Sequence, residues 1–170
     1  MSDTFRDTSF HDPLAGIVLP EDGRQSETAR GIQRGAMRYL AARGLVGVPE
    51  FCLASGRRAD IAALDARGEV WVVEIKSSVI DFRTDRKWND YRLHCDRLLF
   101  AVGPDFPLDI LPEDTGILVA DPFGAGLVRE APHHPMPGAT RKALTLRFAR
   151  AAAGRLMGLM DPEALRGIEL

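Results

Sequence analysis

The run Val70-Trp-Val-Val constrains the fold of this chain more than any other feature. All four residues favour strands, and they leave neither face of such a strand polar. A strand of this kind has to be covered on both sides, as in a sheet that carries helices on its two faces. Helical patterns at 26–43 and 140–160 supply such covers. The sequence therefore predicts an α/β fold with a mixed central β-sheet flanked by helices.

The length and composition suit one ordinary globular domain. The chain has 170 residues, of which 45% are hydrophobic and 27% are charged. Its net charge of −2 excludes a globally basic protein that coats nucleic acid, although it allows a local basic face. Two cysteines, Cys52 and Cys95, are too few for a disulfide framework or a zinc cluster. The polar start and the lack of an apolar run of roughly 18 residues predict a cytoplasmic protein without a membrane span.

The expected elements follow the order αβββαββα. They are a helix over 26–43, strands over 46–54, 59–64 and 69–76, a helix over 81–97, strands over 98–102 and 116–120, and a helix over 140–160. Residues 1–25 are acidic and turn-rich and are interpreted as an N-terminal arm, with 161–170 as a tail. No linker divides the stretch between them, so 26–160 is predicted to form a single domain.

A tight hairpin joins the second and third predicted strands and determines which residues face each other. With 66–68 as its loop, the antiparallel register places Asp60 directly opposite Glu74. Opposed residues share a face, with Cβ atoms about 4.5–5.5 Å apart. Because side chains alternate along a strand, Lys76 shares that face and Ile75 points to the other one. Two carboxylates and one ammonium are therefore predicted to converge at one end of a buried strand.

This convergence suggests a metal site with a neighbouring cation. Opposed like charges are destabilising unless a cation lies between them. Mg²⁺, or Mn²⁺, suits the position, because Mg²⁺ uses one or two protein carboxylates and completes its shell with waters and substrate phosphate. The carbonyl of Ile75 is a further candidate ligand. Lys76 could then orient or deprotonate an attacking water, or neutralise charge on a phosphate. The alternative is an exposed hairpin end, where Glu74 and Lys76 form a surface ion pair and Asp60 has no special role.

Several segments of the chain resemble a known family. They are Arg58-Ala-Asp-Ile-Ala, Glu74-Ile-Lys-Ser-Ser, Asp81-Phe-Arg-Thr-Asp-Arg-Lys-Trp-Asn-Asp-Tyr and Cys95-Asp-Arg. Over about 26–158 the chain resembles the MmcB-type bacterial proteins related to DNA repair, within the PD-(D/E)XK nuclease superfamily. The resemblance implies a restriction-endonuclease-like fold with an αβββαβ core. It also implies that Asp60 and Glu74 are metal-binding acids and that Lys76 is the catalytic lysine.

Two positions qualify this resemblance. Glu27, on the first predicted helix, lies where many members of the superfamily carry an additional acid. Ala59 stands before Asp60 where the superfamily motif has a proline, a position that is often degenerate. Some members of the superfamily are inactive or only bind nucleic acid, so the motif implies competence for catalysis without proving it.

Candidate contacts to nucleic acid surround the predicted site. They are Arg58, Ser78, Lys87, Trp88 and Tyr91, where the cationic side chains could contact phosphates and the aromatic rings could stack on bases. The alternative interpretation is a solvated helix with mixed charges, whose Trp88 and Tyr91 belong to the core.

The C-terminal predicted helix carries a second basic set. No acidic residue occurs over 131–160, and the basic residues there are Arg141, Lys142, Arg147, Arg150 and Arg155. Such charge asymmetry favours binding of a polyanion, and Arg141 and Lys142 are predicted nucleic-acid contacts. An ordinary surface helix, packed through Leu144 and Phe148 with solvated arginines, is the alternative and is compatible with the first.

Three classes of function follow from these features. The first is a Mg²⁺- or Mn²⁺-dependent DNA endonuclease, or related phosphodiesterase, acting in repair. The second is a DNA-binding repair accessory that keeps the nuclease fold with little or no turnover. In the third, a structural interaction role, the acids and Lys76 are surface decoration. DNA is the expected partner and no membrane is expected. A homodimer is an open alternative, because nucleases that cut both strands are often dimers, and the sequence names no repair partners.

Overall fold

The computed structural model describes residues 26–85 and 87–165. The predicted arm, 1–25, and the end of the predicted tail, 166–170, lie outside the described residues. The elements are α1 Glu27–Ala42, β1 Val46–Cys52, β2 Arg58–Leu64, β3 Val70–Lys76, α2 Val79–Thr84, the 3₁₀ helix η1 Trp88–His94, β4 Arg97–Val102, η2 Leu108–Ile110, β5 Gly116–Ala120, β6 Ala125–Arg129, α3 Gly138–Met160 and η3 Pro162–Leu165. No helix of this described part is long and apolar enough to cross a membrane.

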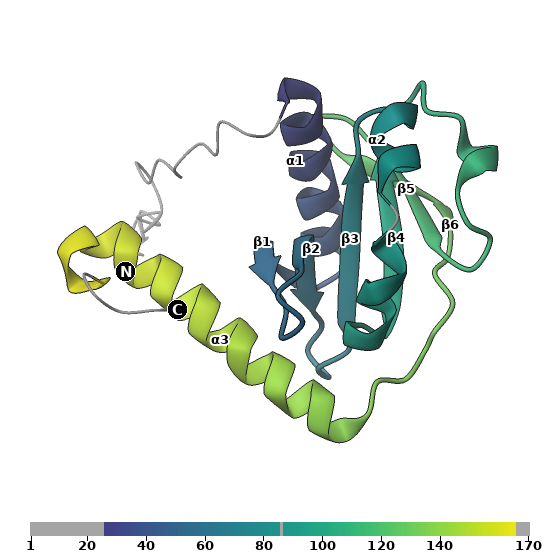
Figure 1. Ribbon diagram of the computed structural model, residues 1–170. Coiled ribbons are helices and arrows are strands. Elements are labelled where there is room, and N and C mark those ends of the chain that lie inside the picture. Colours follow the sequence, from purple (N-terminus) through teal and green to yellow (C-terminus); the bar gives the residue numbers. More distant parts are fainter. Residues whose placement is uncertain (1–25, 86, 166–170) are drawn as a thin grey trace, which may run out of the picture.

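The strands form a six-stranded mixed sheet in the order β1-β2-β3-β4-β5-β6 (Figure 1). The first three strands are antiparallel, β3, β4 and β5 are parallel, and β6 returns antiparallel to β5. All seven residues of β3 are buried, as the run Val70-Trp-Val-Val predicts. The predicted α/β class, with a mixed central sheet flanked by helices, is confirmed and is consistent with a restriction-endonuclease-like fold.

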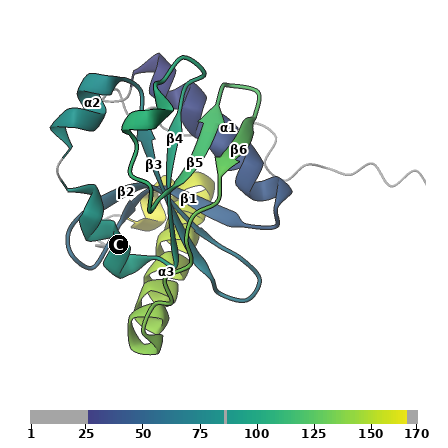
Figure 2. The ribbon, with the colours of Figure 1, turned by 90° about the vertical axis from the view of Figure 1, so that its right-hand side faces the viewer.

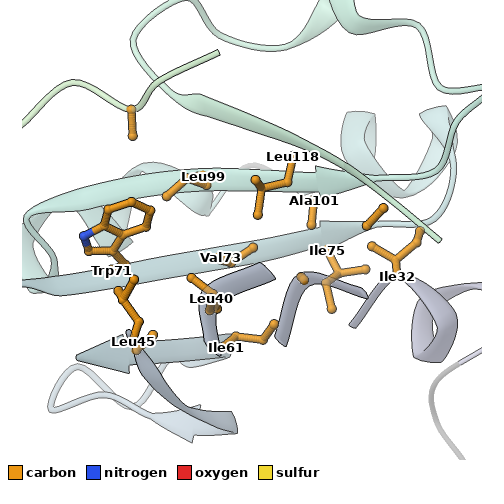
Figure 3. Close-up of a cluster of buried hydrophobic side chains, with 14 residues drawn as sticks. Ile32, Leu40, Leu45, Ile61, Trp71, Val73, Ile75, Leu99, Ala101 and Leu118 are labelled. Carbon is orange, nitrogen blue, oxygen red and sulfur yellow. The ribbon is translucent and has the colours of Figure 1, made fainter. Parts of the chain in front are cut away.

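Helices cover both faces of the sheet, and the turned view of Figure 2 shows α1 and α2 on opposite sides of the strands. On one face, Ile32 and Leu40 of α1 pack against Ile61, Val73 and Leu99 (Figure 3). The other face packs against α3, η1 and α2, through the side chains Leu144, Phe148, Tyr91 and Phe82. Burial of these apolar side chains on both faces is the main favourable contribution to folding.

The predicted register of the β2–β3 hairpin is confirmed. Leu64 pairs with Val70, and Ala62 pairs with Val72. Gly68 has φ +82°, a conformation that a three-residue hairpin loop requires and that glycine adopts without strain. The local turn chemistry therefore determines which residues of β2 and β3 face each other.

The predicted continuous helix over 81–97 is wrong. The chain forms two short helices there, α2 and η1, separated at Asp85, whose φ and ψ of −83° and 100° are not helical. The Asp85 carboxylate accepts hydrogen bonds from the Lys87 amide and from the Lys76 ammonium. These contacts to side-chain oxygens compete with the helical hydrogen bonds and end α2.

Strand β6 does not appear among the predicted elements. Its five residues, Ala-Gly-Leu-Val-Arg, include a glycine and follow a glycine-containing turn, which weakens the strand pattern. Pairing with β5, from Ala120 opposite Ala125 to Ile117 opposite Arg129, stabilises the strand. The partner strand therefore outweighs the weak local propensity.

Candidate active site

Asp60 and Glu74 lie at the end of the hairpin ladder, where each carboxylate accepts a hydrogen bond from a backbone amide of the opposite strand. Regular pairing of β2 with β3 extends to Ile61 and Val73. Beyond it, the Asp60 amide donates to Glu74 Oε1 at 3.2 Å, and the Ile75 amide donates to Asp60 Oδ2 at 2.7 Å. Each carboxylate thus binds the backbone of the opposite strand. The structure brings the two predicted acids together.

Both carboxylates have raised pKa values. Burial raises the pKa of Asp60 to about 6, an effect that its hydrogen bond from Ile75 and the charge of Lys76 only partly offset. The pKa of Glu74, whose residue is 3% exposed, is raised well above its usual value by burial and by the neighbouring charge of Asp60. Two adjacent acids, one buried and one partly buried, favour a proton or a cation between them.

The backbone carbonyl of Ile75 faces the carboxylates of Asp60 and Glu74. The N–H and C=O groups of one strand residue point to the same side of the strand. The Ile75 amide donates to Asp60 across the gap between β3 and β2, so its carbonyl also faces β2. The ladder has ended at this point, so that carbonyl lies beside the carboxylate pair rather than in a β2–β3 backbone pair.

This donor set fits a hard divalent cation with open positions. Within the described ranges, no three His, Cys, Asp or Glu side chains converge as a metal centre. A metal ion at this position would therefore rest on the carboxylates of Asp60 and Glu74 and on the Ile75 carbonyl. Mg²⁺ commonly binds through one or two carboxylates and keeps its remaining positions for waters and phosphate oxygens. The residues present fit that requirement.

Lys76 is buried beside the acids and is held by Asp85. The residue is 4% exposed, and its Nζ donates to Asp85 Oδ2 at 2.6 Å. Burial alone would lower the pKa of Lys76, but the hydrogen bond to Asp85 and the charge of Glu74 outweigh burial and raise it. Lys76 is thus a charged ammonium at neutral pH, a state that suits charge neutralisation better than proton abstraction. This burial also contradicts the interpretation of Glu74 and Lys76 as a surface ion pair.

The predicted stacking residues belong to the core. Tyr91 is buried, and its hydroxyl donates to the Arg58 carbonyl at 3.0 Å. Trp88 packs edge-on against Phe100 with ring centroids 5.7 Å apart. These contacts support the alternative interpretation, in which the two aromatic side chains fill the space between η1 and the sheet.

The polar candidates around the site have different surroundings. The Arg58 Nε lies 2.6 Å from Glu50 Oε2, and Ser78 caps α2 by accepting from the Asp81 amide at 3.1 Å. Lys87 is exposed between α2 and η1. Arg58 and Lys87 are therefore the cationic candidates that reach the surface near the carboxylates, while Ser78 has a local structural contact.

Arg141 binds a buried carboxylate inside the protein. Its two terminal nitrogens donate to the two oxygens of Asp96 at 2.6 and 2.7 Å, and Nη1 also donates to the Gly68 carbonyl. Asp96 is 0% exposed and accepts further bonds from the amides of Val70 and Met136. The Arg141 guanidinium therefore fastens the start of α3 to the sheet, whereas the neighbouring Lys142 is exposed.

Comparison with known proteins identifies the family. The family model for MmcB-like DNA repair proteins matches residues 18–163. The chain belongs to the MmcB-like family. A solved structure, the SPO1766 protein of unknown function from Silicibacter pomeroyi, is 43% identical and matches with a TM-score of 0.81, over 85% of this chain and 99% of that one. No curated protein matches. The family match supports a role in DNA repair.

The described contacts do not connect Glu27 with the acid pair in this MmcB-like protein. Glu27 is exposed in the first turn of α1, which packs against the opposite face of the sheet from Tyr91 and α3. Among the described contacts, no hydrogen bond or ion pair joins Glu27 to Asp60 or Glu74. Its predicted role as an additional acid stays a prediction.

Sequence reasoning did not assign roles to three acids that shape this MmcB-like site. Asp85 holds Lys76, Asp96 anchors α3, and Glu50 pairs with Arg58 while raising the pKa of Asp60. Glu50 also has φ +48°, a left-handed conformation that is unusual for a residue with a side chain. Each contact joins residues distant in sequence or interrupts a regular element, so no local pattern marks it.

Proposed function

We propose that this MmcB-like protein is a divalent-metal-dependent DNA endonuclease, or a related phosphodiesterase, of the PD-(D/E)XK type that acts in DNA repair. The observation that carries the proposal is the adjacent pair of Asp60 and Glu74, with Lys76 on the same strand as Glu74. Burial raises the pKa values of both acids, and the charge of Asp60 raises that of Glu74 further. A structural ion pair would stabilise without such repulsion. Two repelling acids next to a cationic side chain instead match the needs of phosphate chemistry.

One set of residues would bind the metal ion, and Lys76 would contact the substrate. Asp60, Glu74 and the carbonyl of Ile75 would hold Mg²⁺ or Mn²⁺. When bound, such an ion polarises a phosphoryl group and lowers the pKa of a water molecule. The hydrogen bonds from the amides of Ile75 and Asp60 fix one oxygen of each carboxylate, so the two side chains are already oriented before a ligand arrives.

Lys76 supplies a positive charge next to this position. An ammonium has three N–H donors, and one of them is directed at Asp85. The remaining donors can meet a phosphate oxygen as negative charge develops on it in the transition state. Because Lys76 stays protonated, its contribution is electrostatic, an effect worth about 10²–10³-fold in rate for one well-placed donor.

The decisive experiment is cleavage of single-stranded, duplex and branched DNA in the presence of Mg²⁺ or Mn²⁺. Glu74→Gln keeps the size of the side chain and removes its charge, and Lys76→Met removes the ammonium. We expect metal-dependent cutting by the wild type, loss of cutting in Glu74→Gln and a loss of about 10²–10³-fold in Lys76→Met. Asp90→Asn, which removes an exposed ion pair with Arg57, is the control and should cut normally.

A repair accessory that binds DNA without cutting it is the second candidate. The observation that favours it is the close Lys76–Asp85 pair, because the ammonium is already neutralised within the protein. Under this alternative the wild type binds the same DNA panel, with an affinity that falls as salt increases, and yields no cleavage products with either metal.

A further inference from the structure

A groove lies between α3 and the edge strand β1. Its volume is about 480 Å³. Glu50, Phe51 and Cys52 of β1 line one wall, and α3 lines the other with Arg147, Arg150 and Arg155. Phe51 and Phe148 pack together with centroids 5.8 Å apart and join the two walls. The groove thus has an apolar base with three arginines along one side.

The arginines of this groove have two different situations. Arg155 donates to the carbonyls of Pro49 and Glu50, so its guanidinium fastens α3 to β1. Arg147 and Arg150 are exposed, and neither has a hydrogen bond or ion pair with any described residue. They are three positions apart and therefore lie on one side of the helix. Both guanidinium groups are available to an anionic ligand.

The groove leads towards the carboxylate pair. Cys52, in its wall, pairs with Arg58 on the next strand, two residues before Asp60. The pairs on either side, Pro49 with Ile61 and Phe51 with Ala59, place Glu50 beside Asp60, and adjacent strands are about 4.8 Å apart. Phe51 of the groove packs on the side of the sheet that α3 and η1 cover. The acid pair is near η1 on that side, because burial and then the charges of Glu74 and Asp60 raise the pKa of Tyr91. A chain lying in the groove would cross β1 and β2 and reach Asp60 and Glu74.

We propose that this groove binds the sugar-phosphate backbone of DNA, with Arg147 and Arg150 contacting neighbouring phosphates. This inference rests on the proposed function, because it describes how DNA reaches the Asp60–Glu74 pair. Two guanidinium groups on one side of α3 can each neutralise a phosphate of a nucleic-acid strand, and α3 itself carries no acidic residue. An acidic protein segment would meet the same charges, but it would have no use for the neighbouring carboxylate pair.

The test measures DNA binding by Arg147→Gln, Arg150→Gln and the double variant over a range of salt concentrations. The probes are a fluorescent 30-nucleotide single strand and the corresponding duplex, which distinguish the two forms of DNA. We expect each substitution to lower the slope of log affinity against log salt by about 0.7 for the single strand or 0.9 for the duplex. The double variant should bind about tenfold or more weakly near 0.1 M salt.

Arg34→Gln is the matched control, because Arg34 is exposed on α1, on the opposite face of the sheet. It removes the same charge and should leave the salt slope unchanged. An equal loss of DNA affinity in Arg34→Gln and Arg150→Gln would contradict binding in the groove, because it would show only a general effect of charge. A salt slope in the double variant equal to that of the wild type would also contradict binding in the groove. Metal-dependent cleavage of DNA by that variant would at the same time support the proposed function. Binding of an acidic peptide, with no binding of single-stranded or duplex DNA, would contradict both the DNA groove and the proposed function.

Discussion

The carboxylate of Asp60 accepts a hydrogen bond from the backbone of β3, and the carboxylate of Glu74 accepts one from the backbone amide of Asp60. Side-chain oxygens thus accept the hydrogen bonds of the backbone amides where the regular pairing between β2 and β3 ends. The arrangement satisfies the amides at the end of the ladder and holds two carboxyl groups next to each other, with Glu74 buried and Asp60 partly buried. Its electrostatic cost leads directly to the first prediction.

Asp60→Asn is expected to stabilise the metal-free protein at pH 8 and to have little effect at pH 4. The folded-state pKa of Asp60, about 6, is above its ordinary value, so folding becomes less favourable as pH rises through this range. The corresponding gain for the variant at pH 8 is up to about 3 kcal/mol. Urea unfolding at both pH values measures it, and equal effects at pH 4 and pH 8 would contradict the pKa assignment.

Binding of Mn²⁺ is expected to release protons and to weaken as the pH falls below about 6. The raised pKa values of Asp60 and Glu74 mean that the metal has to displace protons from these groups in acid solution. The apparent affinity should fall about tenfold for each pH unit and each proton displaced. Calorimetry in buffers with different ionisation enthalpies counts those protons, and Glu74→Gln should bind the metal much more weakly at every pH.

Asp85→Asn is expected to lower the pKa of Lys76 below that of an ordinary lysine. Without the Asp85 carboxylate, burial becomes the dominant effect on Lys76, and burial favours the neutral amine. The chain contains three lysines, so the resonances of the Lys76 side chain can be assigned in a lysine-labelled sample by comparison with Lys87→Gln and Lys142→Gln. An unchanged Lys76 titration in Asp85→Asn would show that another group holds the ammonium.

Asp96→Asn is expected to destabilise the fold by about 3–5 kcal/mol at pH 7, because it leaves the Arg141 guanidinium without its buried partner. The hydrogen bond from Arg141 and those from the amides of Val70 and Met136 outweigh burial and lower the pKa of Asp96. Its stabilising contribution is therefore present above the ordinary aspartate pKa and disappears as pH falls through the folded value. Lys142→Gln, next to Arg141 but exposed, should change the free energy of unfolding by less than about 0.5 kcal/mol.

Gly35→Ala is expected to disrupt the contact between α1 and the β5–β6 turn. A Cβ atom on Gly35 would lie 2.1 Å from the Asp121 carbonyl oxygen and 2.3 Å from that of Gly124. Both atoms belong to the backbone, so the helix or the turn has to move, at a cost of about 3 kcal/mol or more. Gly126→Ala has open space around its Cβ and serves as the comparison in thermal unfolding. Similar melting temperatures for the two variants would show that the turn yields easily.

Much of the fold and part of the site can be predicted from local sequence. The buried strand β3 follows from its continuous apolar run, and the pairing of Asp60 with Glu74 follows from a three-residue hairpin loop and the two-residue period of strands. The break between α2 and η1 cannot be predicted in this way. It depends on Asp85 turning towards Lys76, nine residues away, and such a contact has no periodic signature.

The sequence alone therefore determined the α/β class, the hairpin register and the position of two acids and a lysine at one strand end, because each depends on residues close together in the chain. Only the tertiary structure decided the charge state of that cluster and which arginines bind within the protein and which stay exposed. Burial between sheet and helices raises the pKa values of Asp60 and Glu74. The path of α3 directs Arg141 onto Asp96, while Arg147 and Arg150 stay in the open groove. Desolvation and long-range contacts act only once the layers have packed, so a linear pattern does not contain them.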